Sequence, residues 1–180
     1  MSKLSELSTP KQLKISEKSK LAIIQSHKKP SAPVENYAEI KKEAEELVKL
    51  TNSDSFTGKW REALALAHCQ VSEDPKAFFA IRRNLKDLFE SEIIVNAKIL
   101  SKDEDSRVTF PAEACMSFPF RDAKKTIRYR EIEVEYEIPV FGFFGPRNGL
   151  KKIRKTVNGL VAFIFQHETD HFHGVNIYGK

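Results

Sequence analysis

The sequence lacks the features that mark membrane and secreted proteins. No apolar run approaches the ~20 residues that a helix needs to cross a bilayer. The two cysteines, Cys69 and Cys115, could form one disulfide at most, which is not the framework of a secreted scaffold. The N-terminus also has no apolar core of a secretion signal. We therefore expect a reducing compartment in which at least one thiolate is used chemically.

The net positive charge of the chain comes from its N-terminal segment. The formal net charge is +5, and residues 1–33 contain seven lysines and two glutamates, so the rest of the chain is balanced. The first 20 residues have no arginine and no aromatic residue, which argues against specific RNA readout. We expect a disordered basic tail at 1–20, available at most for weak electrostatic contacts, and a single domain at 21–180.

Apolar periodicity predicts an α+β fold in which antiparallel β-sheets pack around a C-terminal helix, with a second helix near the N-terminus. The predicted helices span 34–50 and 158–174, with a short helix or insertion at 84–90. The predicted strands are 77–81, 93–100, 127–136 and 151–157. The turn-rich segment 141–149 is expected to connect the last two strands, and 21–33 to form an extended arm.

The last fifteen residues contain an H-E-x-x-H motif that runs from His167 to His171. In a helix these two histidines lie on one face and can bind one metal ion, with Glu168 beside it as a general base. Leu160 and Ile164 belong to the same stripe, so an apolar wall leads to the ligands. The alternative is an ordinary helix whose histidines have no ligand role.

A third ligand must come from upstream. The long protease pattern needs a histidine where the chain has Ile177, and the other common layout needs a glutamate after Glu168, which is absent. A thiolate is a strong ligand for Zn²⁺ or Fe²⁺, and Cys115 lies between two prolines in Pro111–Pro119. Cys115 could equally be a small buried hydrophobic residue. The upstream candidates are His27, His68, Cys69 and Cys115.

Three stretches, in this order, resemble the signatures of the peptide deformylase family. The first signature, G-φ-G-φ-A-A-x-Q, resembles residues 63–70, where alanines replace both glycines and His68 replaces an alanine. The second, E-G-C-L-S, resembles Glu113–Ser117, and the third, Q-H-E-x-D-H, is present unchanged at 166–171. The resemblance implies a metal-dependent hydrolase that removes the formyl group from the N-terminal methionine of a new polypeptide and releases formate.

The resemblance also implies residue roles. One divalent ion, most simply Fe²⁺ with Zn²⁺, Ni²⁺ or Co²⁺ as alternatives, would be held by Cys115, His167 and His171. Glu168 would accept a proton from the attacking water. The Gln70 amide and the Met116 backbone N–H would stabilise the oxyanion. The substrate-binding residues would be Ala63, Leu64, Ala65, Glu113, Leu160, Phe163 and Ile164, with the peptide pairing like an added strand at the two alanines.

Several neighbouring residues have more than one possible role. Asp170 or Glu113 could orient a ligand or hold an arginine such as Arg128. His68 could hydrogen-bond near Gln70, but we expect it to pack inside. The resemblance also allows a transient contact with the ribosome. We expect no membrane and no specific nucleic acid as a partner. The expected location is the cytoplasm of a bacterium or of a phage-infected cell, or an organelle.

Two alternative functions are considered. A metallopeptidase acting on unmodified peptides is disfavoured by the missing downstream ligand. A catalytically weak relative that binds nascent chains is suggested by the alanines at 63 and 65, because they do not easily adopt positive φ.

Overall fold

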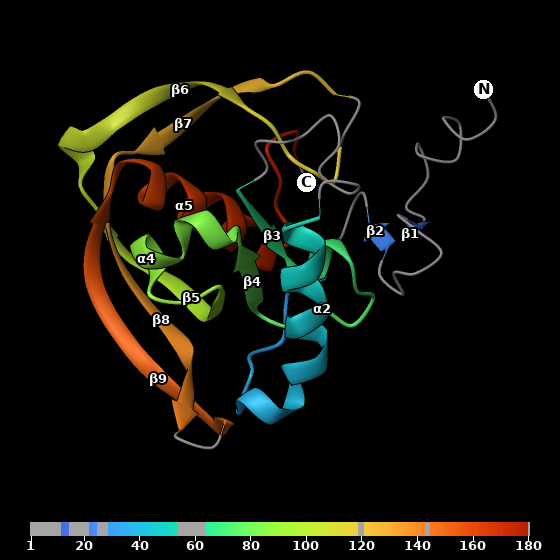
Figure 1. Cartoon of the computed structure of the whole chain (residues 1–180). Helices are drawn as coiled ribbons and strands as arrows, with labels where there is room; N and C mark the ends of the chain where they lie inside the picture. The colour runs from blue at the N-terminus through green and yellow to red at the C-terminus, as the bar shows by residue number, and fades with distance from the viewer. Residues whose placement is uncertain are drawn as a thin grey trace.

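The computed structural model describes residues 12–14, 22–24, 29–53, 64–118, 121–142 and 145–179. An antiparallel sheet of order β3-β4-β5-β8-β9 packs against helix α5 (Figure 1). Its strands are Ala65–Ala67 (β3), Phe78–Ile81 (β4), Ile93–Lys102 (β5), Glu131–Gly142 (β8) and Gly145–Asn158 (β9). The small sheets pair Gln12–Lys14 (β1) with Ala22–Ile24 (β2), and Arg107–Glu113 (β6) with Lys124–Tyr129 (β7). The predicted α+β class is confirmed.

The helices lie on opposite faces of the large sheet. They are Lys41–Thr51 (α2), Lys86–Phe89 (α4) and Gly159–Phe172 (α5), joined by 3₁₀ turns at Tyr37–Glu39 (η2), His68–Gln70 (η4), Arg83–Leu85 (η5) and Glu104–Ser106 (η6). Strand β4 is buried on both faces, with Phe79 in the core against α5 and Phe78 in the core against α2. No helix of the described residues combines the length and apolar character needed to span a bilayer.

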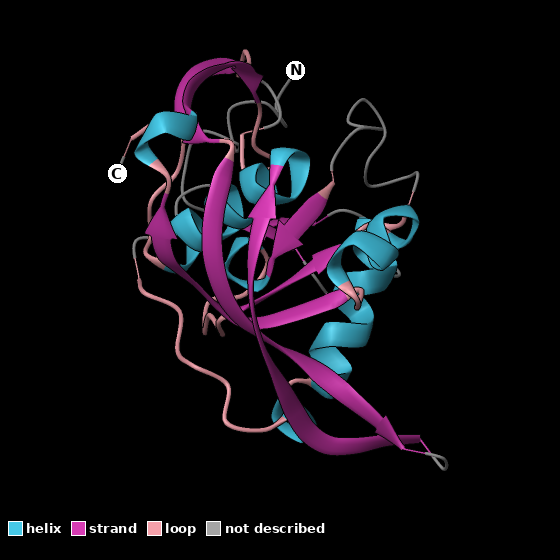
Figure 2. Ribbon diagram, turned by 90° about the vertical axis from the view of Figure 1, so that its left-hand side faces the viewer, coloured by secondary structure: helices cyan, strands magenta, loops and turns pink. Residues whose placement is uncertain are grey.

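Two long hairpins give the molecule its shape. The β8–β9 hairpin extends beyond the rest of the sheet (Figure 2), and the β6–β7 hairpin passes over α5 (Figure 1). β6 leads directly to the segment that contains Cys115, so this hairpin brings the cysteine to the helix that carries the histidines.

Several predicted boundaries are wrong. The predicted strand 127–136 is two strands in two sheets. The Arg130 N–H donates to the Ser106 carbonyl at 3.0 Å, and the Arg130 carbonyl accepts the Gly159 N–H at 2.8 Å. Neither group therefore bonds to a strand that continues the ladder. The predicted turn segment 141–149 lies largely in β8 and β9, whose pairing continues to Gly142 and Gly145.

The N-terminal half of the chain also departs from the prediction. The helix expected from residue 34 begins at Lys41, because the Asn36 side chain caps the 3₁₀ turn η2. Within residues 1–20, the structure describes strand β1, which pairs with β2. The other residues of 1–20 are outside the described part of the chain.

Candidate metal centre

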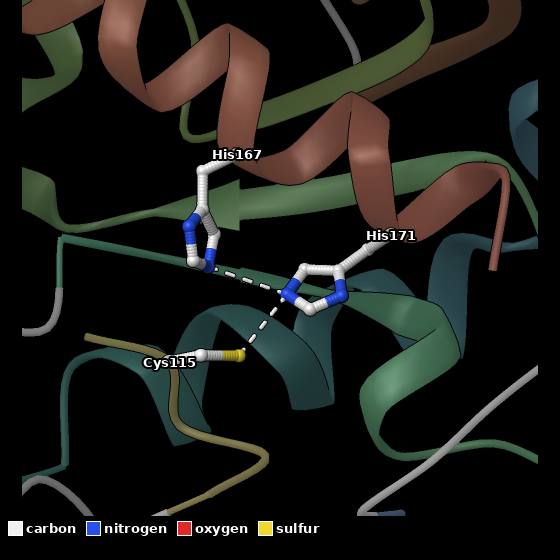
Figure 3. A group of neighbouring side chains, drawn as sticks. All are labelled: Cys115, His167 and His171. Carbon is white, nitrogen blue, oxygen red and sulfur yellow. Dashed lines mark hydrogen bonds between the residues drawn. The ribbon is translucent and has the colours of Figure 1, made fainter. Parts of the chain in front are cut away.

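Three donor atoms converge between α5 and the segment after β6. The Nε2 atoms of His167 and His171 are 3.3 Å apart, and the Cys115 sulfur is 3.3 Å from His171 Nε2 (Figure 3). All three donor atoms lie within 4.8 Å of one another. Metal–nitrogen bonds of about 2.0 Å at tetrahedral angles place two nitrogens about 3.3 Å apart. The spacing of these groups therefore fits one tetrahedral metal ion.

The sequence explains why the imidazoles meet. α5 continues without interruption from Gly159 to Phe172, so His167 and His171 lie one turn apart on the same face. Gln166, which we did not predict to have a role, anchors this part of the helix. Its side chain accepts the Tyr129 N–H at 2.9 Å and donates to the Tyr129 carbonyl at 2.8 Å, like a strand partner of β7.

The surroundings of Cys115 favour a thiolate. Cys115 is 1% exposed, and burial alone would raise the pKa of its thiol. The adjacent imidazoles of His171 and His167 favour the thiolate more than burial disfavours it, so the pKa of Cys115 lies well below its ordinary value. The thiolate is the form that binds a divalent metal.

A buried ion network fixes the His167 ring. Glu113 receives two hydrogen bonds from the Arg128 guanidinium, at 2.8 and 2.6 Å, and lies 2.6 Å from His167 Nδ1. Burial would raise the pKa of Glu113, but its bonds with His167 and Arg128 hold that pKa well below the usual range. A carboxylate only accepts hydrogen bonds, so Nδ1 carries the proton and Nε2 is left to face the metal position.

Asp170 completes this network. Its carboxylate accepts a hydrogen bond of 2.7 Å from Arg128 Nη1. The expectation that Glu113 or Asp170 holds Arg128 is confirmed for both residues. Thr126 also donates to Glu113, a contact that the sequence did not reveal.

Glu168 is buried and interacts electrostatically with His167, His171 and Cys115. It is 3% exposed, and its Oε2 atom has no hydrogen-bond partner among the described residues. Burial raises the pKa of Glu168, and the charges of His167 and His171 partly offset that effect. A buried carboxylate with a raised pKa can accept a proton and release it again to a substrate.

Gln70 contacts the sulfur of the cluster. Its Oε1 atom accepts the Ala67 N–H at 2.8 Å, which fixes the orientation of the amide. Its Nε2 atom donates to Ser117 Oγ at 3.0 Å and lies 3.7 Å from the Cys115 sulfur. Met116 lies between Cys115 and Ser117 in the same turn. The amide N–H₂ group thus faces the donor atoms, and Ser117 is an unpredicted partner.

The predicted substrate-binding residues occupy several environments. Leu160 is 42% exposed, whereas Ile164 is buried in the core below α5. Phe163 packs against Phe110 of β6, with ring centroids 4.9 Å apart. Leu64 and Ala65 are partly buried at β3, which is an edge strand of the described sheet, and Ala63 lies outside the described residues.

The other ligand candidates are not part of this cluster. His68 is 1% exposed, stacks on Phe78 at 4.5 Å and accepts the Lys76 N–H at Nδ1, which confirms the predicted packing role. Its Nε2 atom is 3.6 Å from Glu43 Oε2, but burial lowers the pKa of His68 to about 4. The contact is therefore not an ion pair at neutral pH. Cys69 donates to the His171 carbonyl, and His27 is outside the described residues.

Comparisons with known proteins point to one family. The solved peptide deformylase from Thermotoga maritima has the same fold, with 24% identity over 84% of this chain and 87% of that chain and a TM-score of 0.61. The peptide deformylase from Synechococcus elongatus, solved in complex with actinonin, has 22% identity over 93% of this chain and 80% of that chain and a TM-score of 0.66. A probable peptide deformylase from Synechococcus phage S-SSM7 is also similar, with 21% identity over 94% of this chain and 98% of that chain and a TM-score of 0.62. No curated protein sequence matches the chain. A sequence model of the family described as polypeptide deformylase matches residues 21–180, and the chain therefore belongs to that family.

Proposed function

We propose that this deformylase removes the N-formyl group from the initiator methionine of new polypeptides and releases formate. The observation that carries the proposal is the convergence of Cys115, His167 and His171 on one position, with the buried Glu168 next to His167 in the chain. A divalent ion bound there would polarise the formyl oxygen and lower the pKa of a water molecule. Fe²⁺ is our proposed native ion, because a thiolate with two imidazoles suits Fe²⁺ as well as Zn²⁺, Ni²⁺ or Co²⁺ and the family resemblance favours iron.

The residues of the chain supply the proton transfers. Glu168 accepts the proton of the attacking water while the water oxygen bonds to the formyl carbon. The Gln70 Nε2–H and the Met116 N–H donate to the oxyanion that develops. Glu168 then gives the proton to the amine nitrogen as the carbon–nitrogen bond breaks, so formate and a free N-terminus leave. The raised pKa of Glu168 supports both halves of this role.

The peptide binds along the edge of β3. Ala63 and Ala65 would offer backbone groups to it in the manner of an added strand, and β3 has no partner on that edge among the described strands. Leu64, Leu160, Phe163 and Ile164 would contact the methionine side chain. Glu113 would act indirectly, because its carboxylate is engaged by Arg128 and His167.

The proposed substrate suggests a role for the N-terminal tail and a cellular location. We propose that 21–180 is the catalytic domain and 1–20 a basic tail that makes at most transient contacts, for example with ribosomes. The enzyme would act where formylated chains are made, in a bacterial or phage-infected cytoplasm or an organelle.

One assay tests the function. Purified protein is loaded anaerobically with Fe²⁺, Co²⁺, Ni²⁺ or Zn²⁺ and incubated with formyl-Met-Ala-Ser while formate is measured. We expect formate release by the wild type and its loss in Glu168→Gln with metal retained. Cleavage of an unformylated peptide would favour a metallopeptidase, and metal binding without turnover would favour a peptide-binding relative.

A further inference from the structure

The segment that carries Cys115 is attached to the C-terminal segment by an aromatic cluster. The Phe118 and Tyr178 rings pack edge to face, with centroids 5.0 Å apart. The Arg121 guanidinium lies over both rings, 5.1 Å from the Phe118 centroid and 5.0 Å from the Tyr178 centroid. The Tyr178 hydroxyl donates to the Asp122 carbonyl at 2.9 Å. These four residues, Phe118, Arg121, Asp122 and Tyr178, form the Tyr178 clamp.

One side of the clamp is continuous with the sulfur ligand. The Phe118 N–H donates to the Cys115 carbonyl at 2.9 Å, so the aromatic ring and the thiolate belong to the same hydrogen-bonded turn. The Arg121 N–H in turn donates to the Phe118 carbonyl at 3.0 Å. A contact that fixes Phe118 and Arg121 therefore restricts the position of Cys115.

The other side is continuous with the histidine ligands. The chain reverses after α5 at Gly174, whose φ is +69°, and the Val175 N–H returns to the Asp170 carbonyl at 2.9 Å. Ile177 is buried, and the Tyr178 N–H donates to Asn176 Oδ1 at 2.8 Å. Tyr178 is thus held in a defined position relative to the helix that presents His167 and His171.

We propose that Tyr178 and Arg121 are positioning residues that preorganise the metal centre by holding the Cys115 segment against α5. The two imidazoles are fixed by a helix, whereas the sulfur lies in a segment without regular secondary structure. Ordering such a segment on metal binding costs conformational entropy, and contacts that order it beforehand strengthen binding and slow release. The inference depends on the proposed metal-dependent function, because it assigns these residues to the same centre.

The test compares Tyr178→Ala, Tyr178→Phe and Arg121→Ala with the wild type. Tyr129→Phe is the matched control, because its hydroxyl also bonds a nearby group, Glu104, but lies outside the clamp. The rate of Co²⁺ transfer to excess chelator is followed through the cobalt–thiolate absorption. Amide hydrogen exchange over 115–123 is measured in chelator-treated protein.

We expect Tyr178→Ala and Arg121→Ala to release Co²⁺ about tenfold faster, the scale of one aromatic or cation–π contact. Exchange over 115–123 should rise in the same variants, with a smaller rise in Tyr178→Phe and none in Tyr129→Phe. Folded Tyr178→Ala with wild-type cobalt release and wild-type exchange would overturn the proposal. If Tyr178→Ala does not fold, Arg121→Ala decides, because Arg121 is exposed at the surface.

The two proposals fail in different ways. A wild type that binds cobalt but never releases formate would contradict the proposed function. The positioning role of the Tyr178 clamp would still be tested by the rates of cobalt release and amide hydrogen exchange. A wild type that binds no metal would overturn both.

Discussion

The substitution Glu113→Gln tests whether the buried network holds His167 in place. It keeps the shape of the side chain but removes the charge that faces Arg128 and His167. Side chains 113 and 128 are 9% and 10% exposed, so solvent replaces little of what is lost. Removing one partner of a buried pair costs about 3–5 kcal/mol. Arg128 keeps Asp170, which is more exposed, so we expect the lower end, about 3 kcal/mol.

The assay is urea unfolding in excess chelator, so that differences in metal affinity do not enter the measured free energy. For a chain of this size, about 3 kcal/mol corresponds to a fall of roughly 6–12 °C in the melting temperature. Loss of a partner that orients a ligating histidine should also weaken metal binding by roughly 10–100-fold. Glu135→Gln is the control, because its Lys152 pair is exposed and should contribute less than about 1 kcal/mol.

The reasoning would be refuted by a Glu113→Gln protein that unfolds within about 1 kcal/mol of the wild type and binds metal equally well. That result would mean that the network neither stabilises the fold nor orients His167. A loss of stability with unchanged metal affinity would retain the first role and reject the second.

Three further predictions use separate readouts. Gln70→Ala should lower kcat for formyl-Met-Ala-Ser by roughly 10²–10³-fold with a smaller change in KM, and an equal rate would remove Gln70 from the mechanism. Gln166→Leu should reduce the free energy of unfolding by about 1–3 kcal/mol, because it leaves backbone groups of Tyr129 unpaired, and an unchanged urea midpoint would reject that role. Burial lowers the pKa of His68 to about 4, so stability should fall by up to about 3 kcal/mol as the pH drops from about 6.5 to about 4. His68→Asn should flatten that part of the stability profile, and an equally steep profile would contradict the assignment.

The ligand pair on α5 could be predicted because helix geometry is local. Four-residue spacing places His167 and His171 on one face regardless of the rest of the fold. The upstream sulfur is different, since nothing in the spacing identifies Cys115 among the candidates. The family resemblance singles it out, and the structure brings it to the histidines through the β6–β7 hairpin.

The remaining partners depend on long-range contacts that no local pattern encodes. Gln166 bonds to the backbone of Tyr129, and Gln70 to Ser117, across large separations in sequence. The break at Arg130 is of the same kind, because its backbone bonds to Ser106 and Gly159, whereas the alternation of acidic and apolar residues begins only at Glu131. Tertiary contacts, and not the period-two pattern, fix the boundary at that position.

X-ray absorption at the metal edge of the loaded protein tests the central claim most directly. A centre made by Cys115, His167 and His171 should show one sulfur at about 2.3 Å and two imidazole nitrogens at about 2.0–2.1 Å, for zinc. The sulfur should disappear in Cys115→Ser. A coordination sphere of nitrogen and oxygen alone in the wild type would contradict the account.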